Sequence, residues 1–220
     1  MKKYKIIVLI IFIVLVFSFS KAYAHINDLP LLGKVIYIDP GHGGPDPGAV
    51  YKDIYEKDIN LLISKYLEEE LISQGAIVYM IRDGDYDLSN PKTSMRKRSD
   101  LSKRVELINK SLCDMYLSIH LNMYPSEKWQ GAQVFYKDKN SNNKEIAKVM
   151  QDTLKRSLYT KRNIKEINGM YLYDRVIRPG ILIEAGFLSN TNERYLLRQK
   201  YYQRKLAIVI TQGVINYFNN

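Results

Sequence analysis

The chain has 220 residues, of which 46% are apolar, and this size and composition suit one globular domain with a substantial core rather than two domains. Its formal charge is +10 at pH 7, but no long basic run or nucleic-acid-binding motif accompanies that charge, which argues against a nucleic-acid-binding protein. The only cysteine, Cys113, excludes an intramolecular disulfide and is expected to be a buried structural thiol at the start of an apolar run.

The first 24 residues have the composition of a targeting segment. A basic start, MKKYK, precedes an apolar run at residues 6–19, and AYA at residues 22–24 fits a small-residue cleavage site. The run is shorter than the roughly 20 residues that span a bilayer, which favours a cleaved signal peptide over an N-terminal membrane anchor at residues 1–24. In both cases the domain is expected to be exported. Without the four lysines of this segment the charge of +10 becomes about +6, which fits an anionic wall polymer or membrane face.

The next residues predict a strand, a helix and a second strand. KVIYID at residues 34–39 is a short apolar run between a glycine and a Pro-Gly turn, as in a buried strand. EKDINLLISKYLEEELISQG at residues 56–75 repeats apolar residues at steps of three and four and ends at a glycine, which predicts an amphipathic helix. AIVYMIR at residues 76–82 is a second strand, so the opening unit implies a parallel pair.

The rest of the chain continues this alternation. Residues 83–100 are polar and without a clean period, and are expected to form an exposed excursion. The elements predicted after it are a helix at 101–111, strands at 115–121 and 132–136, a helix at 142–159, strands at 169–174 and 180–187, and helices at 191–199 and 201–218. This order predicts an α/β domain over residues 34–218, in three layers, with a mostly parallel twisted sheet of about six strands and helices on both faces.

Acid and imidazole groups stand at the ends of three predicted strands. His42 lies just past the first strand, His120 ends the third, and Glu184 ends the strand GILIE, while Glu56 begins the first long helix. Because ligands bind at the carboxyl ends of parallel strands, these side chains can converge although they are far apart in sequence. Two imidazoles and a carboxylate are a zinc-type ligand set, and a further carboxylate can serve as the base for an activated water.

Each of these residues also has a simpler explanation. A single histidine near a strand end is more often a hydrogen-bonded structural residue than a ligand, and Glu56 alone suits the positive end of a helix dipole. Glu184 is harder to explain in this way, because an acid flanked by GILI and AGFL is buried at a cost unless it has a partner or a task. The glycines of GHGGPDPG lack the residues of a phosphate-binding loop, and no Gly-x-Ser-x-Gly elbow of a serine hydrolase occurs.

Taken in order, these segments resemble a known family. IDPGHGGPDPGA, Glu56, RVELIN, LSIHLN, GAQVFY and LIEAGFLSN are similar to the zinc-dependent N-acetylmuramoyl-L-alanine amidases of the amidase-3 type, over about residues 34–218. The motifs are specific in combination, order and spacing. A finer resemblance is to the spore-associated, germination-specific CwlD-type subgroup, carried by RKRSDLSKRVELIN, SIHLN, WQGAQVFY and YQRKLA.

The resemblance implies a site and a reaction. The ligands of one Zn²⁺ per chain fall on His42, Glu56 and His120, and the catalytic carboxylate falls on Glu184. The substrate is the amide between the lactyl group of N-acetylmuramic acid and L-alanine of the peptidoglycan stem peptide. Zinc would polarise its carbonyl and acidify a water, while Glu184 would pass the water's proton to the leaving nitrogen. For the subgroup, this reaction takes place in the spore cortex, where a deacetylase then completes muramic-δ-lactam.

Four further residues near the expected site are assigned supporting roles, each with a simpler alternative. Asp39 and Asn122 are expected to anchor the loops beyond the first and third strands through backbone amides, or simply to form turns. Arg104 either orients a carboxylate or is a surface charge. Trp129, in the loop MYPSEKWQ, either stacks on sugar or packs as a lid.

Two other classes remain open for this sequence. A peptidase or deacetylase that acts on the same polymer would have the same metal ligands and would cut another bond. A catalytically weak wall-binding protein would bind the polymer at its surface without efficient turnover. The partners expected are peptidoglycan glycan with its stem peptides, an accessory exported protein, a link to a peptidoglycan deacetylase, and a membrane through the N-terminal segment.

Overall fold

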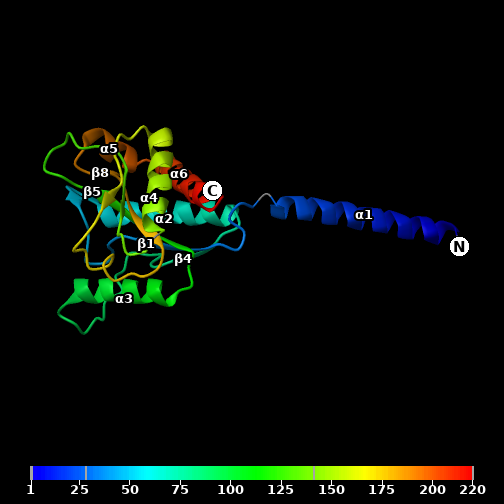
Figure 1. The fold of residues 1–220 in the computed structure, drawn as a ribbon, viewed down its shortest axis with the longest axis horizontal. Helices are drawn as coiled ribbons and strands as arrows, with labels where there is room; N and C mark the ends of the chain where they lie inside the picture. Colours follow the sequence, from blue (N-terminus) through cyan, green and yellow to red (C-terminus); the bar gives the residue numbers. More distant parts are fainter. Residues whose placement is uncertain (1, 28, 141, 220) are drawn as a thin grey trace.

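The computed structural model describes residues 2–27, 29–140 and 142–219, and the side chains of residues 2, 3, 5, 6 and 19–27 lie outside that description. A twisted six-stranded sheet forms the centre of the fold (Figure 1). Its strands, in spatial order, are β4 (Ile77–Met80), β1 (Val35–Pro40), β5 (Met115–Asn122), β8 (Gly180–Phe187), β6 (Gln133–Tyr136) and β7 (Lys165–Glu166).

Neighbouring strands run parallel with one exception. β1 pairs in parallel with β4 and with β5, β5 with β8, and β6 with β7, whereas β6 and β8 are antiparallel. β1, β5 and β8 are therefore adjacent at the middle of the sheet, so their carboxyl ends lie side by side. The predicted α/β class and the mostly parallel sheet are confirmed.

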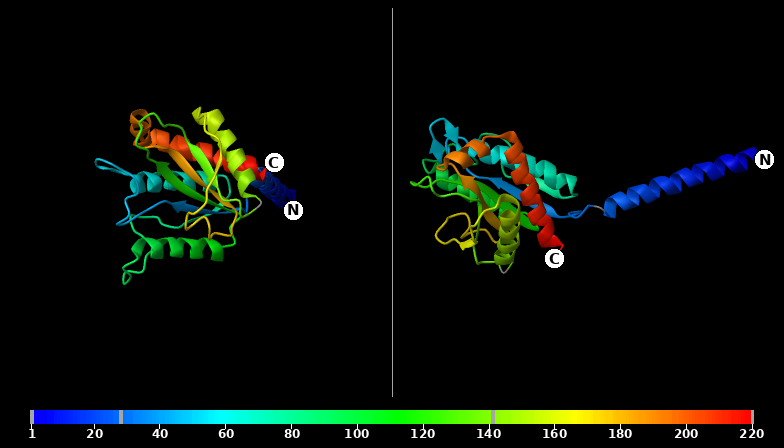
Figure 2. Two further views of the ribbon diagram at one scale, coloured as in Figure 1. Left: turned by 60° about the vertical axis from the view of Figure 1, so that its left-hand side comes forward. Right: turned by 90° about the horizontal axis from the view of Figure 1, so that it is seen from above.

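Helices cover both faces of the sheet. The helices α2 (Glu56–Ser73), α4 (Asn143–Leu158) and α6 (Lys200–Phe218) lie on one face, and α3 (Arg96–Lys110) covers the other (Figures 1 and 2). The short α5 (Thr191–Leu197) joins β8 to α6. These layers confirm the three-layer arrangement.

Alternation along the strands divides the apolar residues between the two faces. In β1, Ile36 and Ile38 pack into the core beneath α2, α4 and α6, whereas Val35 and Tyr37 pack toward the smaller core beneath α3. A buried isoleucine or leucine side chain contributes roughly 1.5–3 kcal/mol relative to its exposed state, so both cores hold the sheet. The same alternation directs every second residue of β5 and β8 toward the α3 side of the sheet.

Two element predictions are wrong. Residues 169–174 form a turn and not a strand, because the amide of Asp174 donates to the carbonyl of Met170, while Leu172 and Tyr173 are buried beneath α3. The sixth strand is β7 instead. The polar excursion is also shorter than expected, since α3 begins at Arg96 and buries Asp100.

Some smaller features lie around this framework. A hairpin of β2 (Val50–Tyr51) and β3 (Ile54–Tyr55), which no sequence pattern predicted, precedes α2. The predicted buried state of Cys113 is confirmed.

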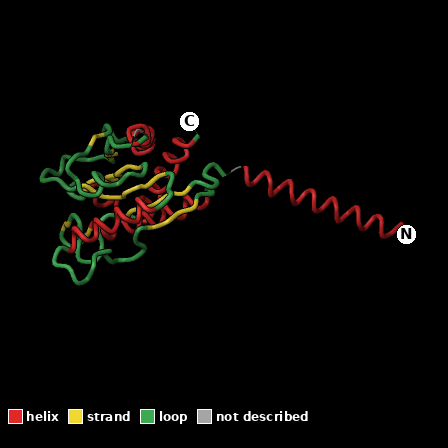
Figure 3. Tube along the Cα trace, turned by 60° about the horizontal axis from the view of Figure 1, so that its bottom comes forward, coloured by secondary structure: helices red, strands yellow, loops and turns green. Residues whose placement is uncertain are grey.

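The helix α1 (Lys2–Asn27) stands apart from the sheet and its helices (Figures 1 and 3), and the side chains of residues 7–17 are exposed. The cleavage sequence expected at residues 22–24 falls among the side chains outside the description. Within the described ranges, no helix has the length and apolar character of a bilayer-spanning segment.

Candidate functional site

The chain leaves β1 through a tight turn that carries His42. His42 adopts a left-handed backbone conformation with φ of 64°, which is uncommon for a residue other than glycine. Gly41 before it has no room for a side chain, because an added Cβ would lie 2.2 Å from the imidazole ring of His120. The turn therefore places the two imidazoles in contact, with ring centroids 4.9 Å apart and nearly perpendicular planes.

Two arginine side chains hold this turn in place by donating hydrogen bonds to three successive backbone carbonyl groups. The carbonyl of Pro40 accepts hydrogen bonds from Arg82 Nε (3.0 Å) and Arg104 Nη1 (2.9 Å), and the carbonyl of His42 accepts one from Arg104 Nη2 (2.6 Å). The carbonyl of Gly41 accepts one from Arg82 Nη2 at 2.9 Å. Charged donors make strong hydrogen bonds, so two buried guanidinium groups fix the strained backbone at His42.

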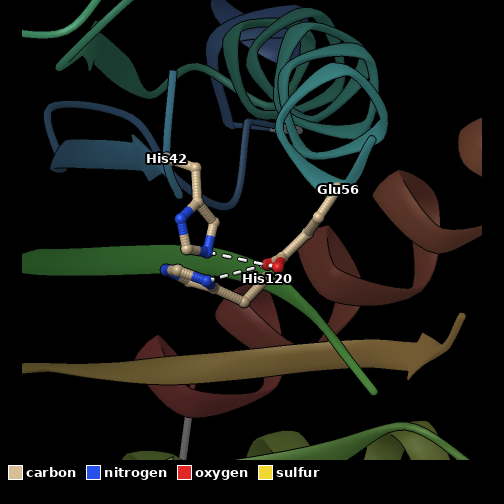
Figure 4. Close-up of side chains that lie close together, drawn as sticks. All are labelled: His42, Glu56 and His120. Atoms are coloured by element: carbon tan, nitrogen blue, oxygen red, sulfur yellow. Dashed lines mark hydrogen bonds and ion pairs between the residues drawn. The ribbon is translucent and has the colours of Figure 1, made fainter. Parts of the chain in front are cut away.

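Glu56, the first residue of α2, reaches both histidines. Its Oε2 lies 3.2 Å from His42 Nε2, and its Oε1 lies 3.0 Å from His120 Nδ1 (Figure 4). Oε1 also accepts hydrogen bonds from Asn60 Nδ2 and the amide of Leu121, both at 3.0 Å. Burial would raise the pKa of Glu56, but the bonds to His120 and His42 outweigh it and hold that pKa well below its usual value.

The three side chains converge as a possible metal site. One ligand atom from each of His42, Glu56 and His120 lies within 4.8 Å of the other two. Gly48 is required beside them, since a Cβ there would lie 2.6 Å from both His42 Cδ2 and Glu56 Oε2. Two ring nitrogens and a carboxylate oxygen are the donor types of a zinc site with three protein ligands.

The tautomer of His42 supports a cation at this position. Its Nδ1 lies 3.0 Å from Asp46 Oδ2 while its Nε2 faces Glu56, but a neutral imidazole donates through one nitrogen only. With the proton on Nδ1, the Nε2 lone pair points at a carboxylate oxygen, so a second proton or a metal ion must separate them. Burial lowers the pKa of His42, but the hydrogen bonds to Asp46 and Glu56 outweigh it and raise the pKa to about 9. Asp46 thus occupies the place of the carboxylate that orients many metal-binding histidines.

Glu184 lies beside this group. It pairs with His120 across β5 and β8 and with Gln133 across β8 and β6. Its Oε2 is buried and has no hydrogen-bond partner among the described residues. Burial raises the pKa of Glu184 to about 7, with Glu56 adding to the rise and His120 and His42 opposing it. A carboxylate with a pKa near neutrality can both accept and return a proton.

The comparison with known families agrees with this arrangement. A family model described as N-acetylmuramoyl-L-alanine amidase matches residues 36–216. The chain belongs to this amidase family.

The chain is also similar to individual amidases over most of its length. The germination-specific N-acetylmuramoyl-L-alanine amidase of Bacillus subtilis (strain 168) is 48% identical over 217 residues, which cover 94% of this chain and 91% of that protein. A structure of the CwlD amidase from Clostridioides difficile in complex with the GerS lipoprotein shares 38% identity, with a TM-score of 0.81 over 85% of this chain and 99% of that one. An N-acetylmuramoyl-L-alanine amidase from Clostridium difficile 630 shares 33% identity, with a TM-score of 0.76 over 85% and 97%. This chain is therefore a peptidoglycan amidase and a homologue of the germination-specific enzyme.

A network of buried polar side chains around Asp39, next to the turn that carries His42, supports the amidase site. The carboxylate of Asp39 accepts hydrogen bonds from Arg104 Nη1 at 2.6 Å and Ser118 Oγ at 2.9 Å, and the Tyr173 hydroxyl donates to Ser118 at 3.1 Å. The expectation that Asp39 binds backbone amides is wrong, because its partners are side chains of α3 and β5. Arg104 is 2% exposed and orients Asp39 and Asp100, so the surface-charge alternative is also wrong. The backbone carbonyl of Asn122 accepts a hydrogen bond from the amide of Leu188.

A cleft of about 200 Å³ opens beside His42 and His120, between α3 and the turn at residues 170–173. Lys97 lies in its wall, and the ring of Tyr171, which also lines it, contacts the guanidinium groups of Arg98 and Arg175, 5.5 and 3.9 Å from the ring centroid. The lining carries charges of both signs, since Asp46 and Asp100 lie in it together with Lys97.

Three further residues shape the amidase site without having been predicted from the sequence: Asp46, Asn60 and Arg82. A signal existed for Arg82, which ends the predicted strand at residues 76–82 as His120 and Glu184 end theirs. Asp46 lies four residues after His42 in the same loop. Nothing in the pattern of α2 distinguishes Asn60 from a solvated helix residue, although it is fully buried and contacts Glu56.

Proposed function

We propose that this amidase is zinc dependent and hydrolyses the amide between the lactyl group of N-acetylmuramic acid and L-alanine of the stem peptide. The proposal rests on one observation, the convergence of His42, Glu56 and His120 beside Glu184, which has a buried oxygen without a hydrogen-bond partner. His42 Nε2, His120 Nδ1 and a carboxylate oxygen of Glu56 are the atoms that would hold the ion. A bound Zn²⁺ supplies Lewis acidity, which polarises an amide carbonyl and lowers the pKa of water.

Glu184 then has two proton transfers to perform. As a carboxylate it takes a proton from the attacking water at its free Oε2, and as a carboxylic acid it gives that proton to the departing alanine nitrogen. A pKa of about 7 suits both directions, because neither protonation state is strongly disfavoured at neutral pH. General acid and base assistance of this kind is typically worth about a hundred- to ten-thousandfold in rate.

We also propose that the reaction takes place in the spore cortex. A relative 48% identical is named as germination specific, which supports action in the spore cortex, where removal of the stem peptide permits a deacetylase to complete muramic-δ-lactam. The CwlD amidase of Clostridioides difficile was solved with the GerS lipoprotein, and this supports an accessory exported protein as a partner here. Residues 1–24 would direct export as a signal peptide or hold the enzyme at the membrane, and residues 34–218 would form the catalytic domain.

The test combines a product assay with metal analysis. Purified enzyme with purified peptidoglycan should release peptides that begin with L-alanine and leave glycan with free lactyl groups, as read by mass spectrometry. Glu184→Gln should keep about one zinc per chain and lose at least a hundredfold in kcat, whereas His120→Ala should lose both zinc and turnover. Glu166→Gln, an exposed acid on β7, is the matched control and should match the wild type.

Two results would contradict these roles. An active Glu184→Gln enzyme would remove that residue from the proton transfers. Products with intact lactyl-peptide bonds and internal cuts in the stem would assign the site to a peptidase instead.

A further inference from the structure

A cluster of exposed aromatic and apolar side chains follows the end of β5. In the loop at residues 123–131, Met123, Tyr124 and Trp129 are 43%, 55% and 44% exposed. The rings of Tyr124 and Trp129 meet edge to face, with centroids 5.6 Å apart. Single exposed apolar residues are ordinary on a protein surface, but three in one short loop mark a binding surface.

Arg162 fixes the position of Trp129. Its guanidinium group lies 4.7 Å from the Trp129 ring centroid and 4.8 Å from that of Phe187, and its Nε donates to the carbonyl of Gln130 at 3.0 Å. The indole is thus ordered in the free protein. A ligand that stacks on it loses little affinity to side-chain ordering.

Two hollows meet at Trp129 and Arg162. One, of about 190 Å³, is also lined by Asn122, Tyr124 and Gln133. The other, of about 590 Å³, continues past Tyr159, which is 85% exposed. We call these two hollows together the Trp129 groove. Two hollows that share Trp129 and Arg162 suit successive units of a linear polymer better than one small molecule.

The Trp129 groove adjoins the site. Asn122 follows His120 by two residues on β5, and Gln133 pairs with Glu184 across β6 and β8. Since a strand rises about 3.4 Å per residue, the near end of the groove is roughly 7 Å from the histidine. The cleft beneath α3 is lined by His42 and His120 themselves, whereas the groove is lined by Asn122 and Gln133, so the site adjoins both.

We propose that the glycan strand of peptidoglycan binds in the Trp129 groove, with a sugar next to the reacting muramic acid stacked on Trp129. Aromatic rings offer a flat surface for the C–H face of a pyranose, and the amides of Asn122 and Gln133 can bond to hydroxyl and acetamido groups. Lys128 and Lys161 in the second hollow complement the lactyl carboxylates of the strand. This inference rests on the proposed amide hydrolysis, which puts a sugar beside the site.

A direct binding test is possible because Trp129 is the only tryptophan of the chain. Glycan strands freed of stem peptides should change its fluorescence in a saturable way, and maltoheptaose, which lacks acetamido groups, should not. Arg162→Met should weaken the apparent glycan affinity several-fold, because the indole loses its support. Tyr201→Ala removes an exposed aromatic residue outside the groove and should leave the titration unchanged.

A kinetic test uses substrates of two lengths. Trp129→Ala should raise KM on polymeric peptidoglycan about five- to tenfold with kcat unchanged, and should change KM on a monosaccharide N-acetylmuramoyl-peptide less than twofold. Trp129→Phe should recover most of the polymer KM, and Tyr201→Ala should match the wild type. Circular dichroism and the unfolding temperature of each variant establish that the fold is kept.

Three outcomes would overturn the proposal: no fluorescence response to the glycan, no effect of Trp129→Ala on the polymer KM, or an equal loss on both substrates. A response to an exported protein without one to glycan would assign the groove to protein docking. If neither substrate is cleaved, the amidase mechanism fails while the titration still decides the groove, so the two failures are distinguishable.

Discussion

Glu184 illustrates at the scale of one residue how a catalytic role conflicts with stability. Its buried Oε2 lacks a hydrogen bond, and burial raises the pKa of Glu184 from its usual value near 4.5 to about 7. The charged form of the side chain therefore destabilises the metal-free fold at neutral pH. A residue selected for packing alone would not be an acid.

We expect Glu184→Gln to stabilise the metal-free protein. A raised pKa means that the folded state binds the proton more tightly, so the contribution of Glu184 to stability is fully present below about pH 4.5 and is lost as the pH rises through about 7. Glutamine does not titrate. The gain in the free energy of unfolding should therefore grow between these pH values and reach about 1–3 kcal/mol at pH 8.

Urea unfolding in the presence of a chelator measures this gain at pH 4.5 and pH 8, with Glu166→Gln as the exposed control. A Glu184→Gln protein that is no more stable than the wild type at pH 8 would show that the carboxylate has a partner in solution.

The sequence was sufficient to single out His42, His120 and Glu184, because polar residues at the ends of apolar strands are conspicuous, and Glu56, because it begins the helix that follows the first of these strands. The structure brings the first three within 4.8 Å and sets Glu184 beside His120. Arg82 also ends a predicted strand, but its position did not indicate its partners, and Asp46 and Asn60 carried no such signal. Their partners are mostly an imidazole, a carboxylate and carbonyl groups that the fold alone brings near, and no local pattern encodes such contacts.

At the scale of elements, the turn between β1 and α2 depends on a residue from a different strand. Arg82, just after β4, is 1% exposed and donates to the carbonyls of Pro40, Gly41, Lys57 and Gly84. Burial and the nearby charge of Arg104 lower the pKa of Arg82 to about 10, yet it stays charged at neutral pH. One side chain thus joins β1, α2 and the loop after β4.

We expect Arg82→Met to lower the free energy of unfolding by about 2–4 kcal/mol, because buried carbonyls lose their charged donors. Zinc affinity should fall at least tenfold as the backbone at His42 loosens. Arg82→Lys restores one donor and should recover part of both. Urea unfolding and competition with a zinc chelator measure the two effects.

The control is Arg204→Met on α6, where an exposed arginine lies 3.5 Å from Glu69 and should cost no more than about 1 kcal/mol. An Arg82→Met protein with unchanged zinc affinity would limit this arginine to a purely structural role.

Periodicity predicted long elements well and short ones poorly. The helices α2, α4 and α6 have apolar residues at helical steps over four or more turns, so their existence and type were clear. GMYLYD at residues 169–174 alternates like a strand, but the burial of Leu172 and Tyr173 comes from packing under α3 within a turn. Six residues are too few for periodicity to separate these cases.

At the scale of the molecule, strand order creates the site. The order β1, β5, β8 puts His42, just after β1, at the same edge as His120 in β5 and Glu184 in β8, and α2 brings Glu56 to them. Sequence alternation predicted a parallel sheet but not which strands are neighbours, because that depends on long-range packing. An ion held by His42, Glu56 and His120 would connect the β1 turn, α2 and β5. Metal binding should therefore add to the free energy of unfolding of the whole domain.

We therefore expect zinc to raise the unfolding temperature, and to raise it more at pH 8 than at pH 6. At a zinc concentration about 100 times Kd the gain is about 2.7 kcal/mol, or roughly 5–10 °C for a domain of this size. In the metal-free protein His42 has a pKa of about 9, so its proton stabilises the fold fully below about pH 6.5 and that contribution is lost as the pH rises through about 9. Zinc must displace this proton, so at fixed zinc its advantage should shrink by up to about 1.4 kcal/mol for each unit of acidification. Thermal unfolding with and without zinc should show the shift in the wild type and in His25→Ala, which changes the remaining histidine, but not in His120→Ala. A shift that is equal at both pH values, or that survives in His120→Ala, would place the ion elsewhere.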